Sequence, residues 1–142
     1  MIPVSWSAYE PEVKAALDIL GNGTSSWDDA YDAMDFICAV AQEGYTTQVF
    51  DQLAPRLLQY STQIQLSLLG SLMDSHTTIP HSGLEAELIR LLHGDDWDLI
   101  TTAALALHDV CRVDKNRMMA LREGVILNNL RTFDVIYQRL FP

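Results

Sequence analysis

The sequence has no catalytic or cofactor-binding signature, and only two of its 142 residues are cysteines. It contains neither Gly-x-Ser-x-Gly nor His-Glu-x-x-His, the patterns of many serine hydrolases and zinc proteases. The segment Gly21-Asn22-Gly23-Thr24-Ser25 lacks the Gly-Lys-Ser/Thr ending of a phosphate-binding loop and follows no predicted strand, so we interpret it as a turn. These absences predict a protein that is not an enzyme and that uses no metal and no cofactor.

Long apolar runs are missing as well. The longest, Phe36–Ala41, is far shorter than the roughly 20 apolar residues that a membrane-spanning helix needs. Segment 1–6 has neither basic residues nor an apolar run, so it does not predict a secretion signal of the usual form. Cys38 and Cys111 lie in apolar helical patterns and are expected to be buried thiols of a reducing compartment rather than a disulfide. Together these features predict a cytoplasmic protein with no membrane association.

Positive charge is scarce and concentrated near the C-terminus. The chain has 19 acidic and nine basic residues, for a formal net charge of −10. Residues 1–110 hold 16 acids and three bases, whereas residues 111–142 hold three acids and six bases. Nucleic-acid binding depends on clustered Lys and Arg, so direct binding of nucleic acid is disfavoured. A basic protein is the electrostatically natural partner, with acidity for solubility alone as the competing interpretation.

What the sequence does have is helical periodicity. Apolar residues recur at helical spacing in two consecutive hairpins, 46–74 and 84–111, each with a short polar joint. Joints this short predict that the two helices of each hairpin pack antiparallel. The segment Arg56-Leu57-Leu58 recurs as Arg90-Leu91-Leu92 after 34 residues, a period typical of stacked helix pairs.

Further helices are expected on both sides of these hairpins. They span 8–20, 25–43, 117–123 and 125–141. Ser7 and Glu10 fit a capping box for the first of them. In the first hairpin, Leu58 is expected to extend the apolar stripe, and Pro55 to kink the helix or start a new one. The prediction is one all-α domain over 1–142, with about seven helices, arranged as stacked antiparallel hairpins or as an irregular helix bundle.

Several segments resemble HEAT and armadillo repeats. The HEAT-like segments are Leu53–Leu58 with Ile64–Leu72, and Leu88–Asp96 with Ala103–Leu107. Arg122–Ile126 resembles an armadillo-type helix junction, and Gln42–Gly44 echoes it. The chain departs from the HEAT pattern at the inward arginine of the second helix, because Gln65 and Ile100 stand at the matching positions. The resemblance implies an α-solenoid, a fold that offers an extended binding surface.

The first candidate partner-binding cluster lies in the predicted 25–43 helix. Asp28, Asp32 and Asp35 follow one another at i, i+4 and i+7 and share one side, with Asp29 adjacent. Like charges at this spacing repel by a few tenths of a kcal/mol (~0.2–0.5), so their retention favours a binding face. The competing interpretations are a merely solvated face and, less favoured, a metal site.

The second candidate cluster surrounds an aromatic residue at the joint of the second hairpin. Asp95, Asp96 and Asp98 flank Trp97, and tryptophan is enriched among interface hot spots. An N-cap with Trp97 packed on a neighbouring repeat is the alternative. Trp97-Asp98 echoes Trp27-Asp28 at another predicted helix start. Asp109, about three turns after Asp98, is expected to extend this acidic face.

The histidines are not expected to form a site. His76 and His81 lie in the predicted loop 75–83 without a third ligand at a recognisable spacing, so we expect them to be solvated. His108 and Asp109 are consecutive helical residues and are expected to point in different directions.

By type, a short, acidic, all-helical chain without catalytic residues resembles a bacterial immunity protein, the antitoxin made beside a secreted toxin. The resemblance implies that the acidic face covers the basic active-site groove of a toxin that acts in the cytosol, with a nuclease as the expected class. The alternatives are a HEAT-like adaptor or assembly chaperone, and a small helical enzyme that uses paired carboxylates. The sequence leaves the oligomeric state open.

Overall fold

The computed structural model describes residues 5–142, and these residues form helices and connecting turns without a strand. The helices are α1 (Trp6–Gly21), α2 (Trp27–Val40), α3 (Thr46–Leu57), α4 (Thr62–Asp74), α5 (Ser82–Leu92), α6 (Trp97–Asp109), α7 (Lys115–Leu121) and α8 (Leu130–Leu140). A π-helical turn (Ala41–Tyr45) joins α2 to α3, and two 3-10 turns (Arg122–Gly124 and Leu127–Asn129) lie between α7 and α8. The predicted all-α class is confirmed.

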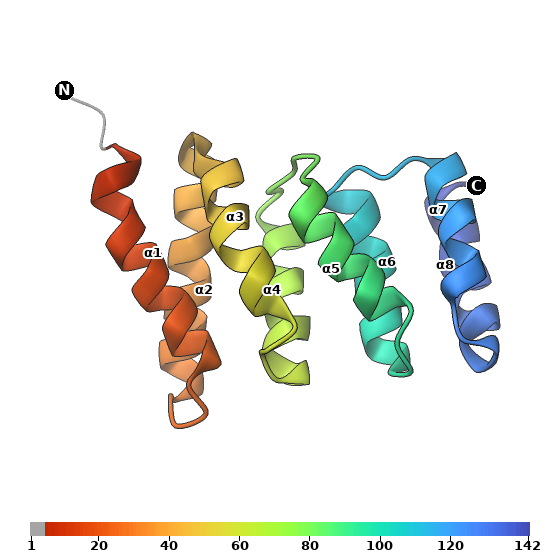
Figure 1. The fold of residues 1–142 in the computed structure, drawn as a ribbon, viewed down its shortest axis with the longest axis horizontal. Helices are drawn as coiled ribbons and strands as arrows, with labels where there is room; N and C mark the ends of the chain where they lie inside the picture. Colours follow the sequence, from red (N-terminus) through yellow and green to blue (C-terminus); the bar gives the residue numbers. More distant parts are fainter. Residues whose placement is uncertain (1–4) are drawn as a thin grey trace.

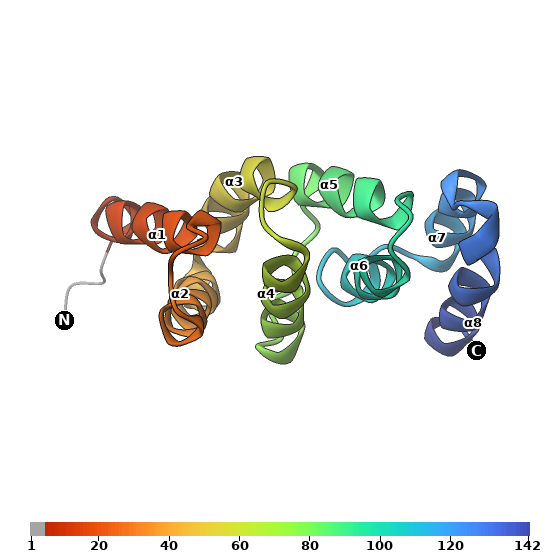
Figure 2. The ribbon, with the colours of Figure 1, turned by 90° about the horizontal axis from the view of Figure 1, so that it is seen from below.

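The helices stack in two layers. Figure 2 shows α1, α3 and α5 in one layer and α2, α4, α6 and α8 in the other. The chain begins at one end of the row and finishes at the opposite end, where α7 lies beside α8 (Figure 1). The α1–α2, α3–α4 and α5–α6 joints all lie along one edge of the stack, the lower edge in Figure 1. We call it the joint edge, and α2, α4 and α6 begin there.

The helices α2, α4 and α6 start in the same way. Each helix begins with a side-chain cap, and their first residues are 27, 62 and 97, hence 35 residues apart. The cap oxygens of Ser26, Ser61 and Asp96 accept from the backbone N–H groups of Asp29, Ile64 and Leu99 at 3.1, 3.3 and 3.1 Å. Each cap satisfies one of the amide donors that a helix start leaves unpaired. The architecture is compatible with a helical repeat whose period is one residue longer than the Arg-Leu-Leu recurrence.

Apolar side chains from all the helices meet in one buried cluster. The predicted inward positions of α6 are all buried. Leu58 is an exception among the predicted core residues, because α3 ends at Leu57 and Leu58 at its C-cap is 39% exposed. The helix also runs through the exposed Pro55 without a new start and ends two residues later.

The two helices of a hairpin do not pack equally closely in all three hairpins. α1 packs along α2, and α5 packs along α6, as the short joints predict, whereas α3 and α4 approach each other less closely. α4 packs instead against α6 of its own layer. The buried Gln65 side chain bridges the looser hairpin by donating to the Leu57 carbonyl at 2.9 Å. Gln65 stands where the HEAT pattern has its inward arginine, so an amide takes that inward position.

The two ends of the chain correct the predicted boundaries. α1 begins at Trp6 rather than Ala8, and Ser7 and Glu10 form no capping box, since the N-cap is Ser5 and its side chain makes no cap bond. Glu10 accepts a hydrogen bond from the Trp6 indole N–H at 2.9 Å instead. α2 ends at Val40, and Gly44, at φ 102°, takes the left-handed conformation that turns the chain into α3.

The predicted 125–141 helix is shorter than expected. Val125 and Ile126 have extended backbone angles, so α8 begins only at Leu130. Leu127 is consequently 80% exposed. Just before this break, Gly124 lies so close to the His93 ring that a Cβ atom would overlap it, so the turn has room only for glycine. No helix among residues 5–142 is both long and apolar enough to cross a membrane.

Two neighbouring leucines test the packing of α3. Leu57 is fully buried and Leu58 is 39% exposed, so Leu57→Ala should lower the free energy of unfolding by about 2–5 kcal/mol. Leu58→Ala, its matched control, should lower it by less than ~1 kcal/mol. Urea denaturation measures both; equal losses would contradict the placement of the helix end.

A second matched pair tests the repeated cap. Asp96 caps α6, whereas the adjacent, exposed Asp95 makes no hydrogen bond or ion pair within residues 5–142. Asp96→Ala should cost about 0.5–2 kcal/mol of stability, and Asp95→Ala, which removes the same charge, should change it by at most ~0.5 kcal/mol. Thermal melting at neutral pH compares them, and similar shifts would argue for a general charge effect.

Candidate partner-binding surface

The layer formed by α2, α4, α6 and α8 is acidic over its first three helices, which carry no Lys or Arg, whereas α8 carries Arg131 and Arg139. The exposed carboxylates of α2, α4 and α6 belong to Asp28, Asp29, Asp32, Asp35, Asp74, Asp98 and Asp109. The three bases of residues 1–110 lie in the other layer, where each pairs with an acid: Lys14 with Glu10 at 3.5 Å, Arg56 with Asp18 at 3.9 Å and Arg90 with Glu87 at 3.2 Å. The α2–α4–α6 face therefore presents these carboxylates without a Lys or Arg of its own, and of the seven only Asp109 has a basic neighbour on the face, His108.

The four aspartates of α2 are all exposed, and three of them line two different grooves. Asp29 and Asp32 line a groove of about 330 Å³ between α1 and α2. Asp35 lines another, of about 380 Å³, between α2 and α4, where Asp74 contributes a further carboxylate. The predicted stripe is thus divided by the curvature of the helix surface. Sequence reasoning missed Asp74, which stands alone at the end of α4 without a local pattern.

The second cluster lies at the start of α6. Trp97 is 61% exposed, so it does not pack on a neighbouring repeat as the alternative interpretation required. The Asp96 carboxylate serves as the N-cap of the helix. Asp95, just before this cap, and Asp98, in the first turn of α6, are both exposed. The indole and two of the three carboxylates are therefore available to a partner.

The starts of α2 and α6 both lie at the joint edge (Figure 1), which places Asp28, Asp29 and the 95–98 cluster there, whereas Asp35 lies in the second half of α2. Trp27, at the first position of α2 as Trp97 is in α6, is 45% exposed, and Tyr31 is 51% exposed. Their rings lie 5.6 Å apart. Trp27 also lines a hollow of about 300 Å³ between the α1–α2 and α3–α4 joints. We define the acidic–aromatic edge as Trp27, Asp28, Asp29, Tyr31, Asp32, Asp95, Asp96, Trp97 and Asp98.

Two members of this edge, Trp27 and Tyr31, were missed as site residues by sequence reasoning. The recurrence of Trp-Asp at two helix starts is the signal that could have found Trp27. Nothing in the local pattern distinguishes Tyr31 from a core aromatic residue. It lies four residues after Trp27, and buried residues of a helix follow one another at the same interval.

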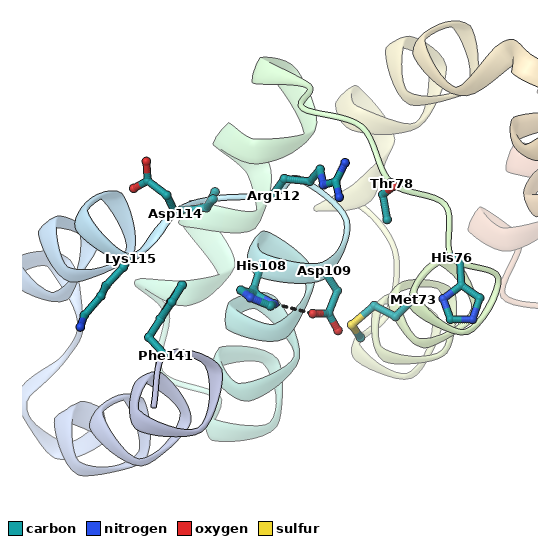
Figure 3. Close-up of a pocket in the computed structure, with 10 residues that line it drawn as sticks. Met73, His76, Thr78, His108, Asp109, Arg112, Asp114, Lys115 and Phe141 are labelled. Carbon is teal, nitrogen blue, oxygen red and sulfur yellow. Dashed lines mark hydrogen bonds and ion pairs between the residues drawn. The ribbon is translucent and has the colours of Figure 1, made fainter.

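Asp109 lies at the other edge of the stack. It ends α6, roughly 16 Å along the helix from Asp98, so it does not extend the acidic–aromatic edge. His108 Nδ1 lies 2.6 Å from Asp109 Oδ1. The expectation that these consecutive side chains diverge is wrong, because the short carboxylate turns back toward the imidazole at the helix end (Figure 3).

The groove around this pair has a volume of about 550 Å³ and mixed charge. Figure 3 shows Met73, His76 and Thr78 on one side and Lys115 and Phe141 on the other. Arg112 and Lys115 make no ion pair within the described residues, and their cationic ends point in different directions. The side chains that line this groove therefore do not form a cluster of one charge that could hold a ligand.

His81 is not a solvated loop residue. Its Nδ1 accepts from the Leu84 backbone N–H at 3.0 Å and caps α5, and its Nε2 lies 2.7 Å from Asp51 Oδ1. His76 is exposed and adopts a left-handed backbone, with φ 54°. Residues 5–142 bring together no group of three or more His, Cys, Asp or Glu side chains that could hold a metal ion.

The two cysteines are separate buried thiols. Burial raises the pKa of the Cys111 thiol to about 12. Burial also raises the pKa of Cys38, against a smaller opposing effect of the hydrogen bond with Ser75. Since the thiolate is the nucleophilic form, neither group is prepared for nucleophilic attack at neutral pH.

The chain matches no known protein family, and comparisons with curated proteins and with solved structures found no match either.

Proposed function

We propose that this chain is a binding protein without catalytic activity, and that its α2–α4–α6 face and acidic–aromatic edge dock against a basic protein surface. One observation carries the proposal. The adjacent helices α2, α4 and α6 expose carboxylates and carry no Lys or Arg, while each Lys and Arg of residues 1–110 is paired in the opposite layer. Such segregation gives one face of the molecule a strong negative potential, which attracts a positively charged partner.

The aromatic residues supply what charge alone does not. Exposed carboxylates speed encounter and fix orientation, but each exposed ion pair adds only about 0–1 kcal/mol. Trp27 and Trp97 are exposed amid those carboxylates. Tryptophan and tyrosine are typical hot-spot residues, because burying their rings removes a large apolar area at little entropic cost. The edge therefore combines long-range attraction with two anchors.

The partner class that fits best is a nuclease domain of a toxin. A nuclease must present clustered Lys and Arg to the phosphates of its substrate, and an acidic surface that covers this groove would block substrate by occlusion. The chain would then act as a bacterial immunity protein in the cytoplasm. Steering by charge raises association rates by ~10–10³-fold, which suits rapid neutralisation of an incoming toxin.

The alternative is a HEAT-like adaptor or assembly chaperone. The two-layer stack of α1–α6 supports it, because stacked hairpins present long surfaces to several partners. Gene context separates the two. The gene for an immunity protein should lie directly beside the gene for a large toxin, and the chain should bind that toxin's C-terminal domain one to one.

Charge reversal tests the proposal. We expect Asp95→Lys with Asp98→Lys, which leaves the Asp96 cap intact, to slow association with the toxin domain by ~10-fold or more and to reduce its salt dependence. Asp28→Lys with Asp32→Lys and Asp35→Lys should act likewise. Stopped-flow association rates at two salt concentrations, with inhibition of DNA or RNA cleavage at equimolar protein, provide the measurement.

A matched control keeps the net charge equal. Asp18→Lys with Asp51→Lys makes the same charge change on exposed residues of α1 and α3, in the opposite layer, and circular dichroism verifies that loss of their pairs with Arg56 and His81 leaves the fold intact. This variant should slow association much less. Equal slowing by both double variants would show that only total charge matters, and undiminished cleavage beside equimolar protein would reject the immunity role.

A further inference from the structure

The N-terminal end of the stack presents an apolar groove with acidic margins. The groove lies between α1 and α2 and includes Ala15, Ile19 and Phe36 together with Glu12, Asp29 and Asp32. Ile19 is 36% exposed. The groove faces away from α3, because α1 contacts the α3 side through other residues: Asp18 pairs with Arg56, and the Leu17 carbonyl accepts from the Tyr60 hydroxyl at 2.8 Å.

The C-terminal end presents a ridge of the opposite charge. Arg131, Val135 and Arg139 follow one another at intervals of four and form one stripe along α8, and Leu127 lies in the 3-10 turn just before it. All four are exposed, Leu127 at 80% and Val135 at 46%. The opposite side of α8 buries Phe133 and Ile136, and α8 packs on α6. The stripe therefore faces out of the stack.

The two arginines of this ridge are available for a partner. Among the C-terminal bases, Arg117 pairs with Glu85 of α5, and Arg122 pairs with Asp134 of α8 itself. Arg131 and Arg139 make no ion pair with any described residue. Residues 111–142 thus pair some of their arginines with acids of the same molecule. The remaining arginines of the ridge are exposed beside two apolar side chains.

The two ends are complementary in three respects. The groove is concave, whereas the stripe is a helix ridge. Each surface has an apolar centre. The groove carries three carboxylates, and the ridge carries two guanidinium groups. They lie at opposite ends of the row of helices (Figure 1), so one molecule cannot join them. A second copy can, and docking α8 on the next α1–α2 pair would continue the stack.

We propose that this chain binds a second copy of itself head to tail, with the α8 ridge of one molecule in the α1–α2 groove of the next. The contact uses different surfaces on the two partners, so it does not close on itself, and it extends into short chains of molecules at high concentration. Arg–carboxylate pairs give it a salt dependence, because exposed ion pairs are screened by added salt. The inference is independent of the proposed function, although Asp29 and Asp32 belong to both surfaces.

Analytical ultracentrifugation of the full chain over a concentration series tests the proposal. At low salt the average mass should rise with concentration beyond that of a dimer, and it should fall back toward the monomer at about 1 M salt, where the Debye length is about 3 Å. A wild-type protein that stays monomeric at every concentration would overturn the inference, as would a dimer that does not grow.

Two variants with one disabled end each sharpen the test. Glu12→Arg with Ile19→Arg blocks the groove using α1 residues outside the acidic–aromatic edge, and Arg131→Glu with Arg139→Glu reverses the ridge. Each variant alone should remain a monomer where wild type associates. An equal mixture should form a one-to-one dimer and stop at two, because only one working groove and one working ridge remain.

The mixture decides the matter even if one variant is less stable. Circular dichroism verifies folding, and Leu127→Glu, at a position 80% exposed, is a second ridge variant that does not disturb the core. A mixture that stays monomeric, or single variants that associate like wild type, would overturn the proposal. The ridge variants should leave binding to a basic partner unchanged, so failure here and failure of the proposed function are distinguishable.

Discussion

Burial of apolar helix faces against neighbours on both sides is the constraint that organises this molecule. A single hairpin of α3 and α4 cannot cover its own apolar stripes, and α4 contacts α6 more closely than it contacts α3. Each helix therefore depends on the next unit of the stack, as in repeat architectures. Two consequences follow: every helix keeps one solvent face, and the stack has two ends that no neighbour covers.

The first consequence explains how charge becomes segregated. With the inner sides of α2, α4 and α6 occupied by the core, their polar residues lie on the outer side, and the carboxylates among them meet no Lys or Arg of the same helices. Carboxylates gathered in this way repel one another, so the arrangement weakens the isolated protein slightly and is relieved by salt or by a positive partner. Charge that opposes folding but favours encounter is what a binding surface needs.

Residues 111–142 differ from the rest of the chain in charge, because they are rich in bases and some of these bases pair with acids of the same molecule. Arg117 of α7 reaches the buried Glu85, which ties the last helices to α5. The hydrogen bonds and charge of Arg122 lower the pKa of Asp134. A carboxyl whose pKa is lowered by folding stabilises the native state at neutral pH, and this contribution is lost as the pH falls through that lowered value.

Local signals in the sequence determined the helices themselves. The hairpins over 46–74 and 84–111 match α3–α4 and α5–α6 closely, because periodicity and capping residues act within a few neighbouring residues. Only the tertiary structure decided that Asp29 and Asp35 open onto different grooves, that His81 caps α5, and that Trp27 and Trp97 share an edge. The reason is physical: spacing along one helix states which side chains lie together on it, but which helices lie alongside depends on packing between residues far apart in the chain.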